Sequence, residues 1–175
     1  MEAQSLRDWR NATALRIAWK TASRWMDVAQ LTKQQFFAVT PTMVGIDWLD
    51  RTKTTKSDPY RPSRYVLITG AWTRTIYDMI RTLRPNDSVT TLTTTDVTKL
   101  LQRVSPELTS YSIRHGAMKK VAEGAAAGKV QPQTVSILAK HKLTEALMAN
   151  TTIRYVQNPV AIAKIFQTHK ATALL

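Results

Sequence analysis

Apolar residues recur at helical spacing over the first 28 residues of the chain. A helix of 3.6 residues per turn brings every third or fourth residue to the same face. Here the residues near one face are Leu6, Trp9, Thr13, Ile17 and Ala18. The spacing predicts a helix over residues 3–28.

The pattern changes between residues 35 and 69, where short apolar runs replace the helical spacing. QQFFAVTP, MVGIDWL and SRYVLIT are rich in β-branched and aromatic residues and are separated by Pro, Asp and Lys clusters. Runs of this length and composition predict a small three-stranded antiparallel sheet. The polar segment 51–63 is then a long turn between the second and third strands.

Helical spacing returns at Thr73 and continues to the end of the chain. It predicts helices over 73–84, 95–104, 109–127, 131–139 and 143–151, and a last amphipathic helix that Pro159 opens. We expect Thr95 to cap the second of these helices and Gly128 to end the third. The fold class is therefore α+β, mainly helical, with a small antiparallel sheet.

Two of these helices carry recognisable apolar faces. In the helix over 109–127 the stripe consists of Ile113, Ala117, Val121 and Ala125, and we expect Arg114 on the opposite side. In the last helix the apolar face consists of Ile162, Ile165 and Phe166.

Length and composition indicate one domain, residues 1–175, inside a cell. The chain has 43% hydrophobic residues and no cysteine, which excludes disulfides, zinc knuckles and thiol nucleophiles. No run approaches the roughly 20 apolar residues of a membrane span, and the polar start MEAQSLRDWR is unlike a secretory signal. The three histidines do not cluster, so we expect no metal and no cofactor. The five tryptophans indicate core packing.

The charge indicates a polyanionic partner. Lys and Arg number 25 against 12 Asp and Glu, a net charge of +13, and the basic residues are spread along the chain. Nucleic acid is the commonest intracellular polyanion, so we expect a folded basic surface that binds it. Charge alone favours a binder without chemistry, similar to a ribosomal or chromatin protein.

Five segments contain the residues that a metal-free cutter of phosphodiesters needs. Such an enzyme requires a nucleophile, arginines for the phosphoryl oxygens, and an acid for the leaving oxygen. The segments, in chain order, are TALRIAWKTASRWMDV at 13–28, RTKT at 51–54, YSIRHGA at 111–117, ILAKH at 137–141 and TTIRYVQ at 151–157. In this order they resemble the conserved boxes of tyrosine recombinases, the phage integrase family.

The resemblance covers essentially the whole chain and implies the catalytic fold of that family. The family's first box reads T-G-L-R-I-S-E-x-x-x-L-R-W-x-D-I. Matching it box by box implies a catalytic set of Arg16, Lys53, Tyr111, Arg114, His141 and Tyr155. The implied activity is DNA cleavage and rejoining through a 3′-phosphotyrosyl link to Tyr155. The two arginines and His141 would hold the phosphoryl oxygens, and Lys53 would protonate the leaving oxygen.

The sequence departs from the family pattern at three positions. Trp19 stands where an acidic residue usually follows the first arginine by three positions, and Tyr111 where the second box begins with His or Lys. Lys140 replaces the glycine of the L-G-H box. Lys56 is a rival to Lys53 as the general acid. These departures resemble the divergent recombinases of DIRS-like retroelements, which implies DNA integration in a eukaryotic nucleus.

The resemblance also implies partners. We expect double-stranded DNA as the substrate and a homo-tetramer on DNA, formed through the C-terminal helix, which could equally pack on its own chain. Only fifteen residues precede Arg16, so we expect a catalytic fragment or an unusually short member of the family, without its N-terminal DNA-clamping domain. Two alternatives stay open: a degenerate DNA-binding module without activity, and a type IB topoisomerase-like enzyme that relaxes DNA.

Overall fold

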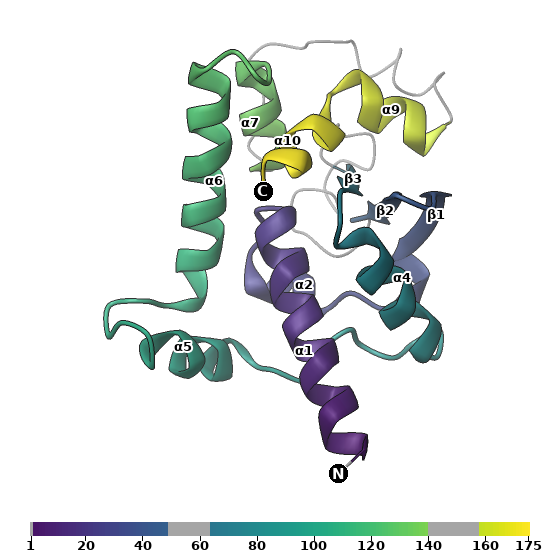
Figure 1. Cartoon of the computed structure of the whole chain (residues 1–175), viewed down its shortest axis with the longest axis vertical. Helices are drawn as coiled ribbons and strands as arrows, with labels where there is room; N and C mark the ends of the chain where they lie inside the picture. Colours follow the sequence, from purple (N-terminus) through teal and green to yellow (C-terminus); the bar gives the residue numbers. More distant parts are fainter. Residues whose placement is uncertain (1, 49–63, 140–157) are drawn as a thin grey trace.

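The structure is a computed structural model that describes residues 2–48, 64–139 and 158–175. It is mostly helical, with one small antiparallel sheet (Figure 1). The elements, in chain order, are α1 (Glu2–Lys20), α2 (Trp25–Ala29), η1 (Lys33–Gln35), β1 (Phe36–Thr40), β2 (Met43–Asp47), β3 (Tyr65–Thr69), α4 (Thr73–Thr82), α5 (Thr94–Gln102), α6 (Ser110–Ala126), α7 (Pro132–Leu138), α9 (Pro159–Ile165) and α10 (Thr168–Leu174). The α+β fold class is confirmed.

The predicted three-stranded sheet is confirmed in order and direction. The strands lie in the order β1-β2-β3, and both pairs are antiparallel. Phe37 of β1 pairs with Gly45 of β2, and the ring of Phe37 occupies the space above the glycine, where a Cβ would lie 2.1 Å from the ring. The glycine therefore makes room for the aromatic side chain.

The main core lies between α1, the sheet and α6. Ile17 and Ala18 of α1, Val44 and Ile46 of β2, and Val121 of α6 are fully buried in it. Figure 1 shows α1 running through the middle of the molecule, with α6 on one side and the sheet and α4 on the other. Helix α1 therefore lies at the centre of the fold.

The first helix is shorter than its apolar spacing predicts. It ends at Lys20, and a separate helix α2 begins at Trp25. Between them the N–H of Ser23 donates to the carbonyl of Ala18 at 3.1 Å, a pattern that ends helices at a left-handed residue, usually glycine. That residue here is Ala22, with φ of 47°, and the turn it forms directs the chain into α2. The prediction of one helix over 3–28 was therefore wrong in its second half.

Two further details of the helices differ from expectation. Thr93, and not Thr95, caps α5, because its hydroxyl accepts from the N–H of Asp96 while the Asp96 carboxylate accepts from Thr93. On α6 the stripe residues Ala117 and Val121 are buried as predicted. Arg114 is also buried, so its expected place opposite the stripe was wrong. Gly128 ends α6 as predicted, with φ of 70°.

The C-terminal helices pack on their own chain. Ile162 and Phe166 are buried, whereas Ile165, on the same predicted face, is 45% exposed. Helix α10, which the spacing did not predict as a separate element, lies along β3. There the hydroxyl of Thr168 accepts from the N–H of Leu67 at 3.3 Å, and the hydroxyl of Thr172 donates to the Leu67 carbonyl at 2.7 Å. Within the described ranges, no helix is long and apolar enough to cross a membrane.

Candidate functional site

Arg114 is held in the interior by backbone carbonyls from two distant segments. Its side chain leaves α6 and is only 5% exposed. One guanidinium nitrogen donates to the carbonyl of Ala22, in the turn after α1, at 2.7 Å, and another donates to the carbonyl of Ala139, after α7, at 2.5 Å. A planar guanidinium with five donors can join several acceptors at once. Arg114 therefore joins α6 to the ends of α1 and α7.

Three more polar side chains surround Arg114. Arg24 follows the same turn and begins α2, Asp27 lies one helical turn later, and Tyr111 precedes Arg114 by one turn of α6. Burial and the nearby charge of Arg24 lower the pKa of Arg114, while Tyr111 and Asp27 raise it. We refer to Arg24, Asp27, Tyr111 and Arg114 as the arginine cluster.

The arginine cluster opens to solvent on one side. Arg24 and Tyr111 are exposed, Tyr111 by 61%, whereas Arg114 is buried behind them. Two guanidinium groups close enough to affect each other's protonation repel, and an anion between them would relieve that repulsion. Arginines bind phosphate oxygens in a two-pronged geometry. The arrangement is suited to an anion of the phosphate type.

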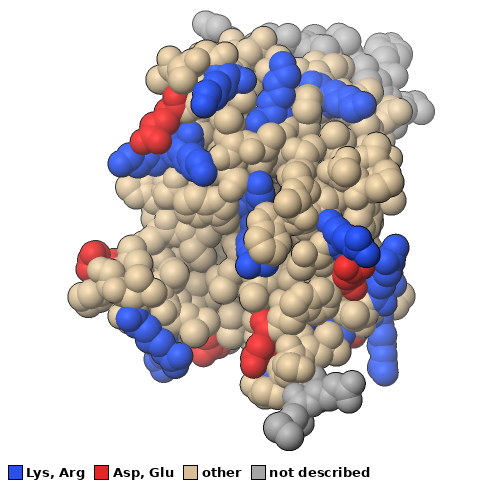
Figure 2. All heavy atoms as spheres, in the orientation of Figure 1, with Lys and Arg blue, Asp and Glu red and all other residues tan. Residues whose placement is uncertain are grey.

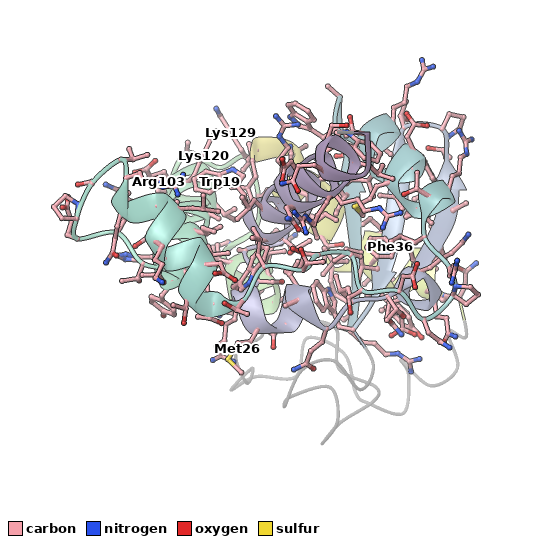
Figure 3. The ribbon with its side chains drawn as sticks, turned by 90° about the horizontal axis from the view of Figure 1, so that it is seen from below. Trp19, Met26, Phe36, Arg103, Lys120 and Lys129 are labelled. Carbon is pink, nitrogen blue, oxygen red and sulfur yellow. The ribbon has the colours of Figure 1, made fainter. Side chains whose placement is uncertain are left out.

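Arg16 lies elsewhere. It is exposed on the middle of α1, and its guanidinium carbon is 3.2 Å from the centroid of the Trp72 ring. It lines a pocket together with Trp19, whereas no residue of the arginine cluster lines that pocket. In Figure 3, Trp19 lies on the upper side of the molecule and Met26 of α2 on the lower side. The structure does not bring Arg16 and Arg114 together.

The remaining predicted site residues are not among those described. Lys53, its rival Lys56, His141 and Tyr155 all lie in the segments 49–63 and 140–157. The residues on either side of 49–63 are well anchored. Arg64 donates to both carboxylate oxygens of Asp47 at 2.8 Å, and the N–H of Trp48 donates to the carbonyl of Arg64 at 2.8 Å. The strand ends before and after the Lys53 segment are therefore fixed to each other.

A second reading of the first box fits the arginine cluster. The sequence T-A-x-R occurs twice, as TALR at 13–16 and as TASR at 21–24. Only the second is followed by an acidic residue three positions after its arginine, Asp27 in place of Trp19. The second also has Ala22 at φ of 47° where the family pattern has glycine, the residue that tolerates this backbone conformation. Asp27 is thus the feature of the sequence that favours Arg24 over Arg16 in this second alignment.

Neither a metal site nor a known relative adds to this description. No group of three His, Asp or Glu side chains that could hold a metal ion occurs among the residues described. A scan against protein-family models, a search of curated proteins and a search of solved structures each found no match to this chain.

Proposed function

We propose that this chain cleaves and rejoins DNA strands as a tyrosine recombinase, with Arg24 and Arg114 as its two phosphate-binding arginines. The observation that carries the proposal is that Arg114 donates to the carbonyl of Ala22, two residues before Arg24, while the charges of Arg24 and Asp27 shift the pKa of Arg114. Asp27 follows Arg24 by three positions, where the family pattern has an acidic residue, whereas Trp19 stands at that position in the register based on Arg16. Arg16 is therefore no longer part of the proposed catalytic set.

In the proposed reaction Tyr155 attacks the scissile phosphate. The Tyr155 hydroxyl loses its proton to solvent as its oxygen bonds to phosphorus, the 5′-oxygen leaves with a proton from Lys53, and a 3′-phosphotyrosyl link remains. Negative charge builds on the non-bridging oxygens, and Arg24 and Arg114 stabilise it. His141 assists, and Tyr111 donates a hydrogen bond without adding charge. A 5′-hydroxyl from a partner strand reverses the step, and strand exchange between two duplexes uses four copies of the chain.

Covalent capture tests the proposal. The substrates are duplexes with a randomised centre, nicked in one strand so that cleavage releases a short 5′-hydroxyl fragment that diffuses away. We expect a denaturant-resistant protein–DNA adduct with the unmodified chain and none with Tyr155→Phe. An equal adduct from Tyr155→Phe would refute Tyr155 as the nucleophile.

A second candidate function is DNA binding without cleavage. The observation that favours it is Tyr111, because this uncharged residue stands where the family has His or Lys. Both functions predict binding to duplex DNA that weakens steeply with salt, since basic side chains displace counterions from the phosphates. DNA binding without any adduct, across the whole randomised set, would identify the chain as a binding module.

A further inference from the structure

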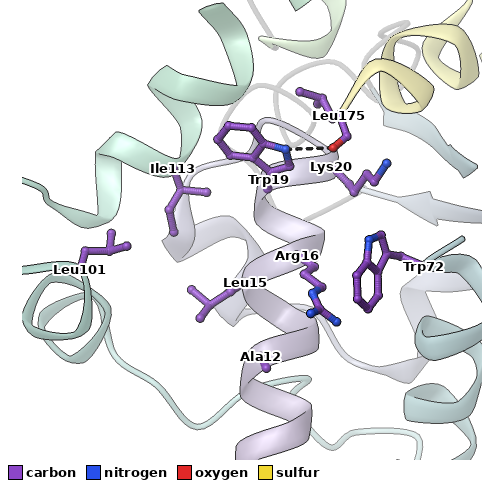
Figure 4. Close-up of a pocket in the computed structure, with 9 residues that line it drawn as sticks. All are labelled: Ala12, Leu15, Arg16, Trp19, Lys20, Trp72, Leu101, Ile113 and Leu175. Carbon is purple, nitrogen blue, oxygen red and sulfur yellow. Dashed lines mark hydrogen bonds between the residues drawn. The ribbon is translucent and has the colours of Figure 1, made fainter. Parts of the chain in front are cut away.

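A pocket of about 370 Å³ lies beside the middle of α1, and no residue of the arginine cluster lines it. Its walls are mainly apolar: Leu15 and Trp19 come from α1, Leu101 from α5 and Ile113 from α6 (Figure 4). Trp72, at the start of α4, closes the opposite side and is 38% exposed, although the sequence indicated core packing for all five tryptophans. A pocket of this size can take a small ligand or a few side chains of a peptide.

Positive charge surrounds this apolar pocket. Arg16 stacks on Trp72, which holds its guanidinium in place, and no carboxylate or hydrogen-bond acceptor contacts it in the described part of the chain. Lys20 also lines the pocket, and its Nζ donates to the carbonyl of Thr172 at 3.1 Å. The positive charge of Lys120, on α6, helps to lower the pKa of Lys20. No acidic side chain lines the pocket, and the one oxygen acceptor drawn in it in Figure 4 is the backbone oxygen of Leu175, which accepts from the indole N–H of Trp19 at 3.1 Å.

We propose that this pocket binds an acidic segment of a partner protein, with an apolar side chain inserted between Trp19 and Trp72 and a carboxylate on Arg16. The walls require an apolar group and the free guanidinium requires an anion, so the ligand must carry both. Helical segments that dock in grooves carry both kinds of side chain on one face. The inference does not depend on the proposed recombinase activity.

The charge and the apolar walls of the pocket favour an acidic peptide over two other partners, a second copy of the chain and duplex DNA. A second copy of the chain carries the same net charge of +13 and would be repelled from a basic rim. Figure 2 shows basic side chains spread over this view of the molecule, its middle included, with fewer acidic ones. The phosphate backbone of duplex DNA would satisfy the cations but offers nothing for the apolar walls. An acidic peptide with an apolar anchor satisfies both parts of the pocket.

Selection from a displayed library of random dodecapeptides tests the proposal. We expect enrichment of peptides in which Asp or Glu flanks Leu, Ile, Phe or Trp. Fluorescence anisotropy should show binding weakened by at least about tenfold in Arg16→Glu, as for an arginine that anchors an interface. Ala12→Trp, which fills the pocket from an exposed position on α1, should have a similar effect. Arg7→Glu, exposed on the same helix outside this pocket, is the matched control and should bind normally.

Three results would overturn the proposal. The first is a library without enriched acidic and apolar peptides. The second is peptide binding that Ala12→Trp leaves unchanged while thermal unfolding shows an intact fold. The third is duplex DNA that displaces the peptides and loses affinity equally in Arg16→Glu, which would assign this surface to nucleic acid.

Discussion

The guanidinium of Arg114 donates to the carbonyl of Ala22 across 92 residues of sequence. Ala22 is fully buried and holds the left-handed conformation that ends α1. The bond therefore links the longest helix of the second half of the chain to the turn that precedes Arg24. It gives Arg114 a structural role in addition to the proposed contact with phosphate.

Arg114→Met should destabilise the fold. The substitution keeps an apolar stem but leaves the carbonyls of Ala22 and Ala139 buried without a donor, at a cost of about 1–3 kcal/mol for each. Urea denaturation followed by tryptophan fluorescence measures the change in the free energy of unfolding. Arg114→Lys should be intermediate, because a lysine can reach only one of two diverging acceptors. Arg103→Met, at an exposed position, is the control; equal stability of both methionine variants would contradict the structural role.

Arg24→Ala should strongly reduce activity without affecting the fold, whereas Arg16→Ala should leave both activity and fold unchanged. Arg24 is exposed and its side chain makes no cap hydrogen bond, so its loss should change stability by less than about 0.5 kcal/mol. Loss of one donor to a developing oxyanion slows a reaction by about a hundredfold or more. Single-turnover formation of the DNA adduct measures this effect. A slow Arg16→Ala beside a normal Arg24→Ala would restore the register that places the catalytic arginine on α1.

Gly124→Ala should disturb the contact between α6 and α10. A Cβ at position 124 would lie 2.4 Å from Cδ1 of Leu174, so the leucine side chain must move from its place against α6. Overpacking of this kind costs about 1–3 kcal/mol. The double variant Gly124→Ala/Leu174→Ala tests the cause, since removing the isobutyl group should recover most of the loss. If Gly124→Ala is as destabilising with Leu174→Ala as without it, the clash is not the reason.

The contribution of Lys20 to the stability of the protein should rise with pH below about pH 10.5. Burial, and then the charge of Lys120, lower the pKa of Lys20 below its ordinary value of 10.5. Between the lowered pKa and 10.5 the unfolded chain holds more protons than the folded one, so stability increases as pH rises through that window. Lys120→Gln should raise the pKa of Lys20 and shrink this increase. NMR titration of the lysine side chains measures the pKa of Lys20, and urea denaturation at several pH values measures the stability. Lys129→Gln should leave the pKa of Lys20 unchanged.

The secondary structure could be predicted where local pattern and tertiary environment agree. β-Branched residues cluster in the three strands, and Gly128 and Pro159 mark a helix end and a helix start. The turn at 21–24 could not be predicted in the same way. Ala22 is a strong helix former, and its left-handed conformation is maintained by burial and by Arg114.

The candidate site could be predicted only in part. Arg114 and Tyr111 share one helix face, so a single motif identifies both. Arg24 could be distinguished from Arg16 only by Asp27, because both arginines follow the same T-A-x pattern. The burial of Arg114 could not be predicted from the neighbouring sequence. The spacing of apolar residues does not reveal an arginine whose hydrogen-bond acceptors are carbonyls far away in the chain.

The turn at Ala22 can reach its final hydrogen bonding only late in the synthesis of the chain. Helix α1 and the turn leave the ribosome before Arg114, which donates to the buried carbonyl of Ala22. The second acceptor of the same guanidinium, the carbonyl of Ala139, is synthesised later still. An N-terminal fragment that ends before α6 therefore lacks the group that secures the turn before Arg24. Arg24 is therefore synthesised long before the turn that precedes it can be fixed by Arg114.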